Sequence, residues 1–149
     1  LEPDGTLRDL ALAECNPSYR DGNLGERLAV GAVLALRVDR KADVHERCRT
    51  FLAEKNAVQP VSEHSCGCIF KNPDPELSDG RSAGKLIDDC GGKGRARGDA
   101  HVSLLHGNFI VNRGGAGAAD VLTLIEDVRD LVLEKTGLRL ESEARVWRA

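Results

Sequence analysis

The chain contains no methionine, few aromatic side chains and no long apolar run. Phe, Tyr and Trp make up 3% of the 149 residues, so we expect no aromatic platform on which the bases of a nucleic acid would stack. No apolar stretch reaches the roughly 18 residues that suggest a membrane-spanning helix. Basic residues are not in excess, because the net charge is −3, whereas a nucleic-acid-binding domain usually carries a strong basic surplus. These absences argue against nucleic acid and membrane as partners.

The start of the chain has neither a methionine nor the basic and apolar regions of a signal peptide. We therefore expect an internal starting point, in a fragment or a piece of a larger protein. An odd number of cysteines without a signal peptide fits a reducing cytosol better than a disulfide framework, so the predicted location is cytoplasmic. The five cysteines are Cys15, Cys48, Cys66, Cys68 and Cys90.

The hydrophobic share of 41% suffices for a core, and the length favours one domain while allowing a second, partial unit. In the first part, the pattern predicts a strand at residues 6–14 and a buried strand at residues 28–38. Residues 39–54 have the apolar spacing of an amphipathic helix. Residues 57–67 lack clear periodicity and include Pro60. This connector is the predicted domain boundary.

The second part alternates strands and helices. The pattern predicts strands at residues 68–70, 100–103, 108–112 and 138–147, and helices at residues 82–90 and 118–135. Ser82 provides an N-cap for the first helix, and Gly137 follows the second helix where a C-terminal glycine belongs. The order β-α-β-β-α-β is a split βαβ plan, with helices on one face of a small sheet. The predicted fold class is therefore α+β, with a two-layer C-terminal domain.

Four segments, in this order and spacing, resemble the motifs of one enzyme family, the flavin-dependent UDP-N-acetylenolpyruvoylglucosamine reductases. The family motifs are Tyr-Arg-Asp-Ser, Gly-Ser-x-Phe-Lys-Asn-Pro, Ser-Ala-Gly-x-Leu-Ile and Leu-Glu-Pro-Glu. The matching segments are Tyr19-Arg20-Asp21, Gly67-Cys68-Ile69-Phe70-Lys71-Asn72-Pro73, Ser82-Ala83-Gly84-Lys85-Leu86-Ile87-Asp88, and His106-Gly107-Asn108-Phe109-Ile110-Val111-Asn112 with the helix that leads to Leu140-Glu141-Ser142-Glu143.

The resemblance implies the C-terminal half of such a reductase. Residues 1–56 would be the remnant of an FAD-binding α+β domain, and residues 57–149 would be the substrate-binding domain. The implied reaction reduces UDP-N-acetylglucosamine enolpyruvate to UDP-N-acetylmuramate for peptidoglycan synthesis, with FAD and NADPH as cofactors. The family's principal FAD-binding segments would precede residue 1. We therefore expect the isolated chain to be inactive without a missing N-terminal FAD-binding segment.

The same resemblance assigns roles to individual residues. Cys68 stands where the family has a serine that donates a proton to the substrate, and Glu143 stands at the catalytic glutamate. Arg20, the third implied catalytic residue, stands where an arginine contacts the flavin, with Tyr19 beside it as a second cofactor-binding residue. The substrate-side positions are Lys71, Asn72 and His106.

A cysteine at position 68 is chemically compatible with proton donation. A thiol has a reference pKa of about 8.5, so it is mostly protonated at neutral pH and is a stronger acid than a serine hydroxyl. A nearby cation such as Lys71 could convert the thiol into a thiolate. We therefore expect activity that falls at alkaline pH and that is sensitive to alkylating reagents.

Two interpretations of other kinds stay open. His64, Cys66 and Cys68 could form a zinc or thiol site, but no second cysteine pair supplies the four ligands that a structural zinc normally has. We therefore predict no metal. The alternative function is a non-catalytic nucleotide-sugar-binding module that keeps the substrate-side residues and has lost the flavin chemistry.

Overall fold

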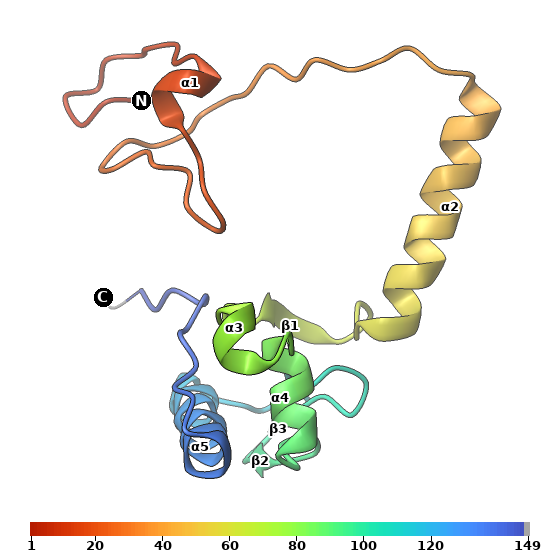
Figure 1. Cartoon of the computed structure of the whole chain (residues 1–149), viewed down its shortest axis with the longest axis vertical. Helices are drawn as coiled ribbons and strands as arrows, with labels where there is room; N and C mark the ends of the chain where they lie inside the picture. Colours follow the sequence, from red (N-terminus) through yellow and green to blue (C-terminus); the bar gives the residue numbers. More distant parts are fainter. Residues whose placement is uncertain (148–149) are drawn as a thin grey trace. The chain divides into compact units, whose positions relative to one another are not determined.

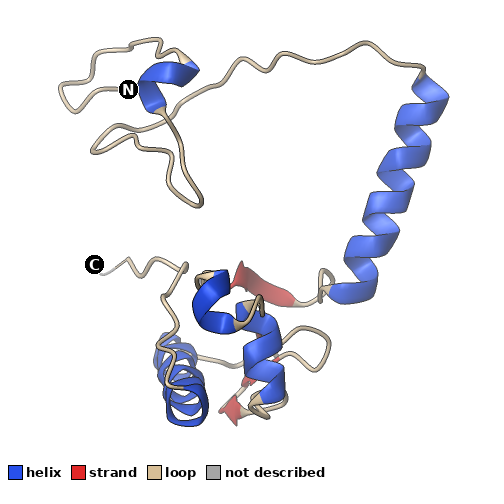
Figure 2. Ribbon diagram, viewed as in Figure 1, coloured by secondary structure: helices blue, strands red, loops and turns tan. Residues whose placement is uncertain are grey.

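The computed structural model describes residues 1–147 and divides the chain into two compact units, Leu1–Lys41 and Ala42–Ala149. The first unit contains one short helix, α1 (Leu12–Cys15), and α2 (Lys41–Val58) begins at its last residue. The remaining elements follow in the second unit (Figures 1 and 2). They are β1 (His64–Cys68), α3 (Pro75–Ser78), α4 (Ala83–Asp89), β2 (Ala96–Arg97), β3 (Ala100–Val102), β4 (Phe109–Asn112) and α5 (Ala118–Thr136).

The four strands form one antiparallel sheet in the order β1-β4-β3-β2. Val102 on β3 is paired with Ile110 on β4, so both side chains lie on the same face. Ala100 lies two residues before Val102 and shares that face. These three side chains are buried and supply the sheet's contribution to the core.

α4 begins and α5 ends at residues suited to those positions. Ser82 accepts a hydrogen bond from the N–H of Lys85 at the start of α4, over 3.3 Å. Gly137 ends α5 in the left-handed conformation, with φ of +75°. The predicted helices at residues 82–90 and 118–135 are therefore confirmed within one residue at each end.

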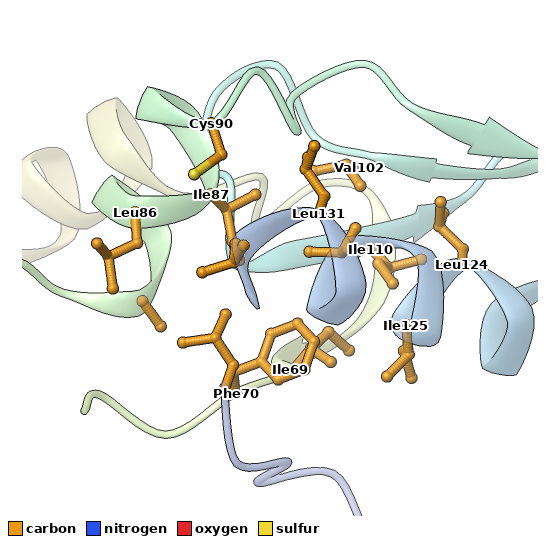
Figure 3. Close-up of a cluster of buried hydrophobic side chains, with 14 of the residues drawn as sticks. Ile69, Phe70, Leu86, Ile87, Cys90, Val102, Ile110, Leu124, Ile125 and Leu131 are labelled. Atoms are coloured by element: carbon orange, nitrogen blue, oxygen red, sulfur yellow. The ribbon is translucent and has the colours of Figure 1, made fainter. Parts of the chain in front are cut away.

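The core lies between α4, α5 and the sheet, and Figure 3 shows its side chains meeting there. α4 contributes Leu86 and Ile87, which are 0% exposed. α5 contributes one apolar stripe to the same core. Its buried members are Leu124, Ile125, Val128, Leu131 and Val132. Because both helices share one cluster with the same sheet face, the second unit has two layers, and the predicted α+β fold class is confirmed.

The predicted strand at residues 138–147 is wrong. The structure has instead one isolated bridge between Phe70 and Ser142, flanked by main-chain hydrogen bonds to Ile69 and Lys71. The pairing stops there because Pro73 has no N–H to donate and the chain turns into α3. The short elements α3 and β2 were not predicted, since four and two residues are too few to establish a periodicity.

Two strand predictions in the first unit are also wrong. Residues 6–14 include the first three residues of α1, and Glu14 accepts a hydrogen bond from the N–H of Ala11 over 2.8 Å at its first turn. Residues 28–38, all of which the structure describes, form no regular element. Their apolar side chains are exposed, with Val33 and Val38 fully so. A strand needs a paired neighbour to stabilise it, and among the described residues only Leu28, at the start of this segment, is paired, through two hydrogen bonds with Leu1.

The helix predicted at residues 39–54 exists as α2, but its amphipathic character is not realised. None of its eighteen residues, all described, is buried. Phe51 and Leu52 are 64% and 62% exposed. The boundary predicted between residues 56 and 57 stays a prediction. Among residues 1–147, no helix is long and apolar enough to cross a membrane.

The core predicts a clear contrast between two leucines of the second unit. Leu86→Ala, at a side chain with 0% exposure, should lower the free energy of unfolding by about 2–5 kcal/mol because it leaves a cavity. Leu77→Ala is the matched control, since Leu77 is 68% exposed and should cost about 0.5 kcal/mol or less. Urea denaturation of both variants measures the difference. Equal losses would show that the core is placed incorrectly.

Candidate active site

Cys68 is the last residue of β1 and lies next to an irregularity in the sheet. β1 pairs with β4 in one register at its start and in a shifted register at Cys68, which is paired with Phe109. Gly67, between the two registers, has a φ of +91°, a conformation that residues with a side chain rarely adopt. A bulge of this kind changes the direction of the next side chain. As a result Cys68 is partly exposed, whereas the two residues that follow it are buried.

Glu143 lies beside the segment that follows Cys68, although the two residues are far apart in the chain. The N–H of Glu143 donates to the carbonyl of Ile69 over 2.8 Å. The bridge between Phe70 and Ser142 adds a second contact between the same stretches of backbone. Cys68 and Glu143 are both partly buried. The fold therefore brings two of the predicted catalytic residues, Cys68 and Glu143, onto adjoining segments.

Lys71 continues the same segment and pairs with Glu141. Its Nζ lies 2.5 Å from Glu141 Oε1, and its N–H donates to the carbonyl of Glu141 over 2.9 Å. The two side chains are 33% and 72% exposed, and surface ion pairs of this kind contribute little stability. A weak surface partner leaves the ammonium group of Lys71 able to exchange that partner for an anion on a ligand.

Asn72 ties the loop after Cys68 to the start of α4. Its Oδ1 accepts a hydrogen bond from the N–H of Ala83 over 3.0 Å. This bond satisfies a donor in the first turn of the helix, which has no partner within the helix itself. Asn72 therefore has a structural role in addition to the substrate contact predicted for it.

His106 lies between β3 and β4 and packs against the start of α4. A Cβ added to Gly84 would lie 2.8 Å from Cε1 of His106, so any other residue there would displace the ring. The ring meets Phe109 edge-on, with centroids 4.8 Å apart. The N–H of Asn108 donates to Nδ1 of His106 over 3.1 Å. This bond requires an unprotonated Nδ1, and therefore a neutral ring with its proton on Nε2.

Burial lowers the pKa of His106 below its ordinary value, and the positive charge of Lys93 lowers it further. The imidazole is therefore neutral at pH 7. Because Nδ1 is already an acceptor, the ring offers Nε2–H as a donor. That arrangement suits recognition of an oxygen atom on a ligand.

Tyr19 and Arg20 belong to the first unit, and their side chains contact each other. The guanidinium carbon of Arg20 lies 5.5 Å from the centroid of the Tyr19 ring, within the range of a cation–π interaction. Arg20 has a φ of +60°, in a turn closed by a bridge between Ser18 and Asp21. The Tyr19 side chain is 60% exposed. The turn presents a cation and an aromatic ring side by side.

One residue that shapes the site was not predicted from the sequence. Asn108 is only 3% exposed, and its side chain forms hydrogen bonds with both main-chain polar groups of Phe70. The sequence pattern assigned Asn108 to a strand and gave it no role of its own. The available signal was a polar residue next to the apolar run at residues 109–111, which is unusual unless its polar atoms have partners.

The described part of the chain has no grouped ligands for a metal. Within residues 1–147, no three His, Cys, Asp or Glu side chains lie close enough together to hold a metal ion. Neither Cys66 nor Cys68 forms a disulfide. The open zinc interpretation therefore finds no ligand set among these residues.

Comparison with known proteins points to one family. The family model of the C-terminal domain of UDP-N-acetylenolpyruvoylglucosamine reductase matches residues 59–147. A reductase of that name from Oleidesulfovibrio alaskensis is 40% identical over 91% of this chain and 45% of its own length. UDP-N-acetylenolpyruvoylglucosamine reductase 2 from Symbiobacterium thermophilum is 41% identical over 97% of this chain and 46% of its own length. The chain thus spans less than half the length of these relatives.

A solved structure leads to the same family. UDP-N-acetylenolpyruvylglucosamine reductase from Thermus caldophilus is 42% identical to the chain and matches with a TM-score of 0.63. The match covers 76% of this chain and 38% of that protein. At this level of identity, the likeness extends to sequence as well as to fold.

The lowered pKa of His106 predicts a loss of stability in mild acid. The unfolded chain binds a proton at this residue at a higher pH than the folded chain does, so stability falls as the pH drops below about 6.5. The urea midpoint should therefore be lower at about pH 5.5 than at about pH 7.5. Asp127, whose pKa is lowered by Arg97, loses its contribution only at more acidic pH.

Replacement of the ring tests the assignment. His106→Asn keeps an acceptor near the position of Nδ1 and should reduce the loss of stability between the two pH values. His101→Asn, at a partly buried histidine on β3, is the matched control and should retain the loss. A variant at position 106 that is as acid-sensitive as the parent would refute the prediction.

Proposed function

The chain belongs to the UDP-N-acetylenolpyruvoylglucosamine reductase family, and from this premise we propose that it provides the proton-donating side of a reductase site. The proposed reaction reduces UDP-N-acetylglucosamine enolpyruvate to UDP-N-acetylmuramate, a precursor of peptidoglycan. The proposed cofactors are FAD and NADPH, and the proposed location is the cytoplasm. Residues 57–149 are proposed as the substrate-binding domain.

One observation carries the proposal: a thiol and a carboxylate are held on adjoining segments from the two ends of the second unit. Cys68 immediately precedes Ile69, whose carbonyl accepts from the N–H of Glu143 over 2.8 Å. Both side chains are partly buried, as acid–base groups in a substrate pocket would be. The cation of Lys71 follows on the same segment.

The reaction converts a carbon–carbon double bond into a single bond by adding hydride to one carbon and a proton to the other. The hydride is what FAD supplies when bound, and it originates in NADPH. Cys68 is proposed to give its Sγ proton to the carbon next to the substrate carboxylate. Negative charge builds up on this carbon during the reaction, so a positioned acid accelerates the step. Glu143 is proposed to assist the return of a proton to the thiolate left on Cys68.

Lys71 and His106 are proposed to bind the substrate. The ammonium group of Lys71 can pair with a carboxylate or phosphate once it exchanges Glu141 for the ligand. His106, neutral with its proton on Nε2, can donate to a ligand oxygen without adding charge. Asn72 is proposed as a third contact from the loop that it ties to α4.

The residues proposed for the flavin fit that role chemically. Arg20 is positively charged at any relevant pH and presents a planar fork of donors, which suits an electron-rich ring. Tyr19 adds an exposed aromatic face against the same guanidinium group. In the proposed role, Arg20 would stabilise negative charge on the reduced cofactor and Tyr19 would contact it.

The test joins this chain to the FAD-binding N-terminal half of a family member and follows NADPH oxidation with and without the UDP-sugar enolpyruvate. Cys68→Ala should lower substrate-dependent turnover by about 100-fold or more, as expected when a general acid is removed. Cys68→Ser should retain turnover and lose both the fall at alkaline pH and the inactivation by iodoacetamide. Cys66→Ala, at an exposed thiol two residues earlier, is the matched control and should behave like the parent.

Two results would count against the proposal in different ways. Full turnover in Cys68→Ala, or after complete alkylation of Cys68, would show that this thiol is not the proton donor. A fusion that binds FAD but shows no substrate-dependent turnover would remove the reductase function. It would leave the nucleotide-sugar-binding module, which keeps only the contacts from Lys71, Asn72 and His106.

A further inference from the structure

Asn108 is buried, and both polar atoms of its side chain form hydrogen bonds with one other residue. Its Oδ1 accepts a hydrogen bond from the N–H of Phe70 over 2.9 Å, and its Nδ2 donates to the carbonyl of Phe70 over 2.8 Å. Its own carbonyl accepts from the N–H of Ile69 over 2.9 Å. Asn108 therefore contacts two consecutive residues of the segment that leads from Cys68 to Lys71.

This contact takes the place of a strand pairing that the backbone does not continue. β4 begins at Phe109, and the chain before it turns at Gly107 against α4. A Cβ added to Gly107 would lie 2.7 Å from the carbonyl oxygen of Gly84, so the turn is packed directly on the helix. The backbone before β4 is therefore directed away from Phe70. The side-chain amide of Asn108 instead provides the acceptor and the donor that a neighbouring strand would have offered to Phe70.

The opposite edge of the same segment is held by the C-terminal residues. Lys71 N–H donates to the carbonyl of Glu141, and the carbonyl of Ile69 accepts from Glu143. Residues 69–71 are thus hydrogen-bonded on both sides, as in a central strand of a sheet. On the Asn108 side, both bonds to Phe70 come from the side chain, so a single substitution can remove them and leave the main-chain bond from Ile69 N–H in place.

We infer that Asn108 is the positioning residue for Cys68 and Lys71, through its clamp on the backbone of Phe70. The inference rests on the proposed function, since it concerns how that site is held. Removing the amide leaves the N–H and carbonyl of Phe70 buried without partners, which favours local opening of the segment. The thiol of Cys68 then loses its fixed position, while the core helices keep theirs.

The thiols of the chain provide a direct readout. Cys68 lies in the clamped segment, whereas Cys90 lies at the end of α4 and is 4% exposed. Iodoacetamide labelling of the folded chain, followed by peptide mass spectrometry, gives a rate for each cysteine. In Asn108→Ala, the rate at Cys68 should rise about fivefold or more, with the rate at Cys90 changing by less than about twofold.

The matched control is Asn112, at the other end of β4. Its Oδ1 accepts from the N–H groups of Gly114 and Ala116 over 2.8 and 3.1 Å, so its side chain also clamps backbone, but in the loop before α5. Asn112→Ala should leave the labelling rate of Cys68 unchanged. Asn108→Asp is the conservative variant: it keeps an acceptor for Phe70 N–H and loses the donor to the carbonyl, so it should also speed labelling at Cys68.

The outcomes separate local positioning from general stability. An unchanged Cys68 rate in either folded Asn108 variant would overturn the inference, and so would equal acceleration at Cys68 and Cys90. In the fused enzyme, Asn108→Ala should lower kcat about tenfold with the KM for NADPH retained. If the parent fusion has no turnover but Asn108→Ala speeds labelling at Cys68 as expected, only the proposed reductase function is refuted. If the fusion is active but labelling at Cys68 is unchanged, only the positioning role of Asn108 is refuted.

Discussion

The hydrogen bonding of residues 69–71 along both edges is the constraint on which the rest of the second unit depends. Asn108 holds one edge and the main chain of Glu141 and Glu143 holds the other. This double pairing directs the Phe70 side chain, which is 2% exposed, into the core. It also keeps Cys68 at the margin of the sheet, where a thiol can reach a ligand. Core and candidate site are therefore two consequences of the same backbone contacts.

Arg129 connects this segment to α5. Its guanidinium carbon lies 5.6 Å from the centroid of the Phe70 ring, and its Nε donates to the carbonyl of Leu140 over 3.1 Å. The helix thereby contacts both stretches of backbone that carry the proposed catalytic residues. Leu140 is itself 2% exposed, so the segment that carries Glu143 begins at a buried residue. This restricts where Glu143 can lie.

Prediction from the sequence succeeded for helices, whose signals are local, and failed for strands, whose stability depends on pairing with a neighbouring strand. α4 and α5 have a cap, a terminal glycine or a continuous apolar stripe within their own residues. Residues 28–38 are equally apolar, but a strand is stabilised by a neighbour that no periodicity reveals. For the same reason, residues 138–147 form only one bridge, between Ser142 and Phe70. The pairing ends there because Pro73 has no N–H to donate.

The sequence by itself determined the family resemblance, the two main helices of the second unit and the residue types available for acid–base chemistry. These follow from motifs and spacings that need no long-range contact. Only the tertiary structure decided that Cys68 and Glu143 lie on adjoining segments, that His106 is neutral with its proton on Nε2, and that Asn108 clamps Phe70. Each of these depends on burial and on hydrogen bonds between residues distant in the chain, which a linear pattern does not specify.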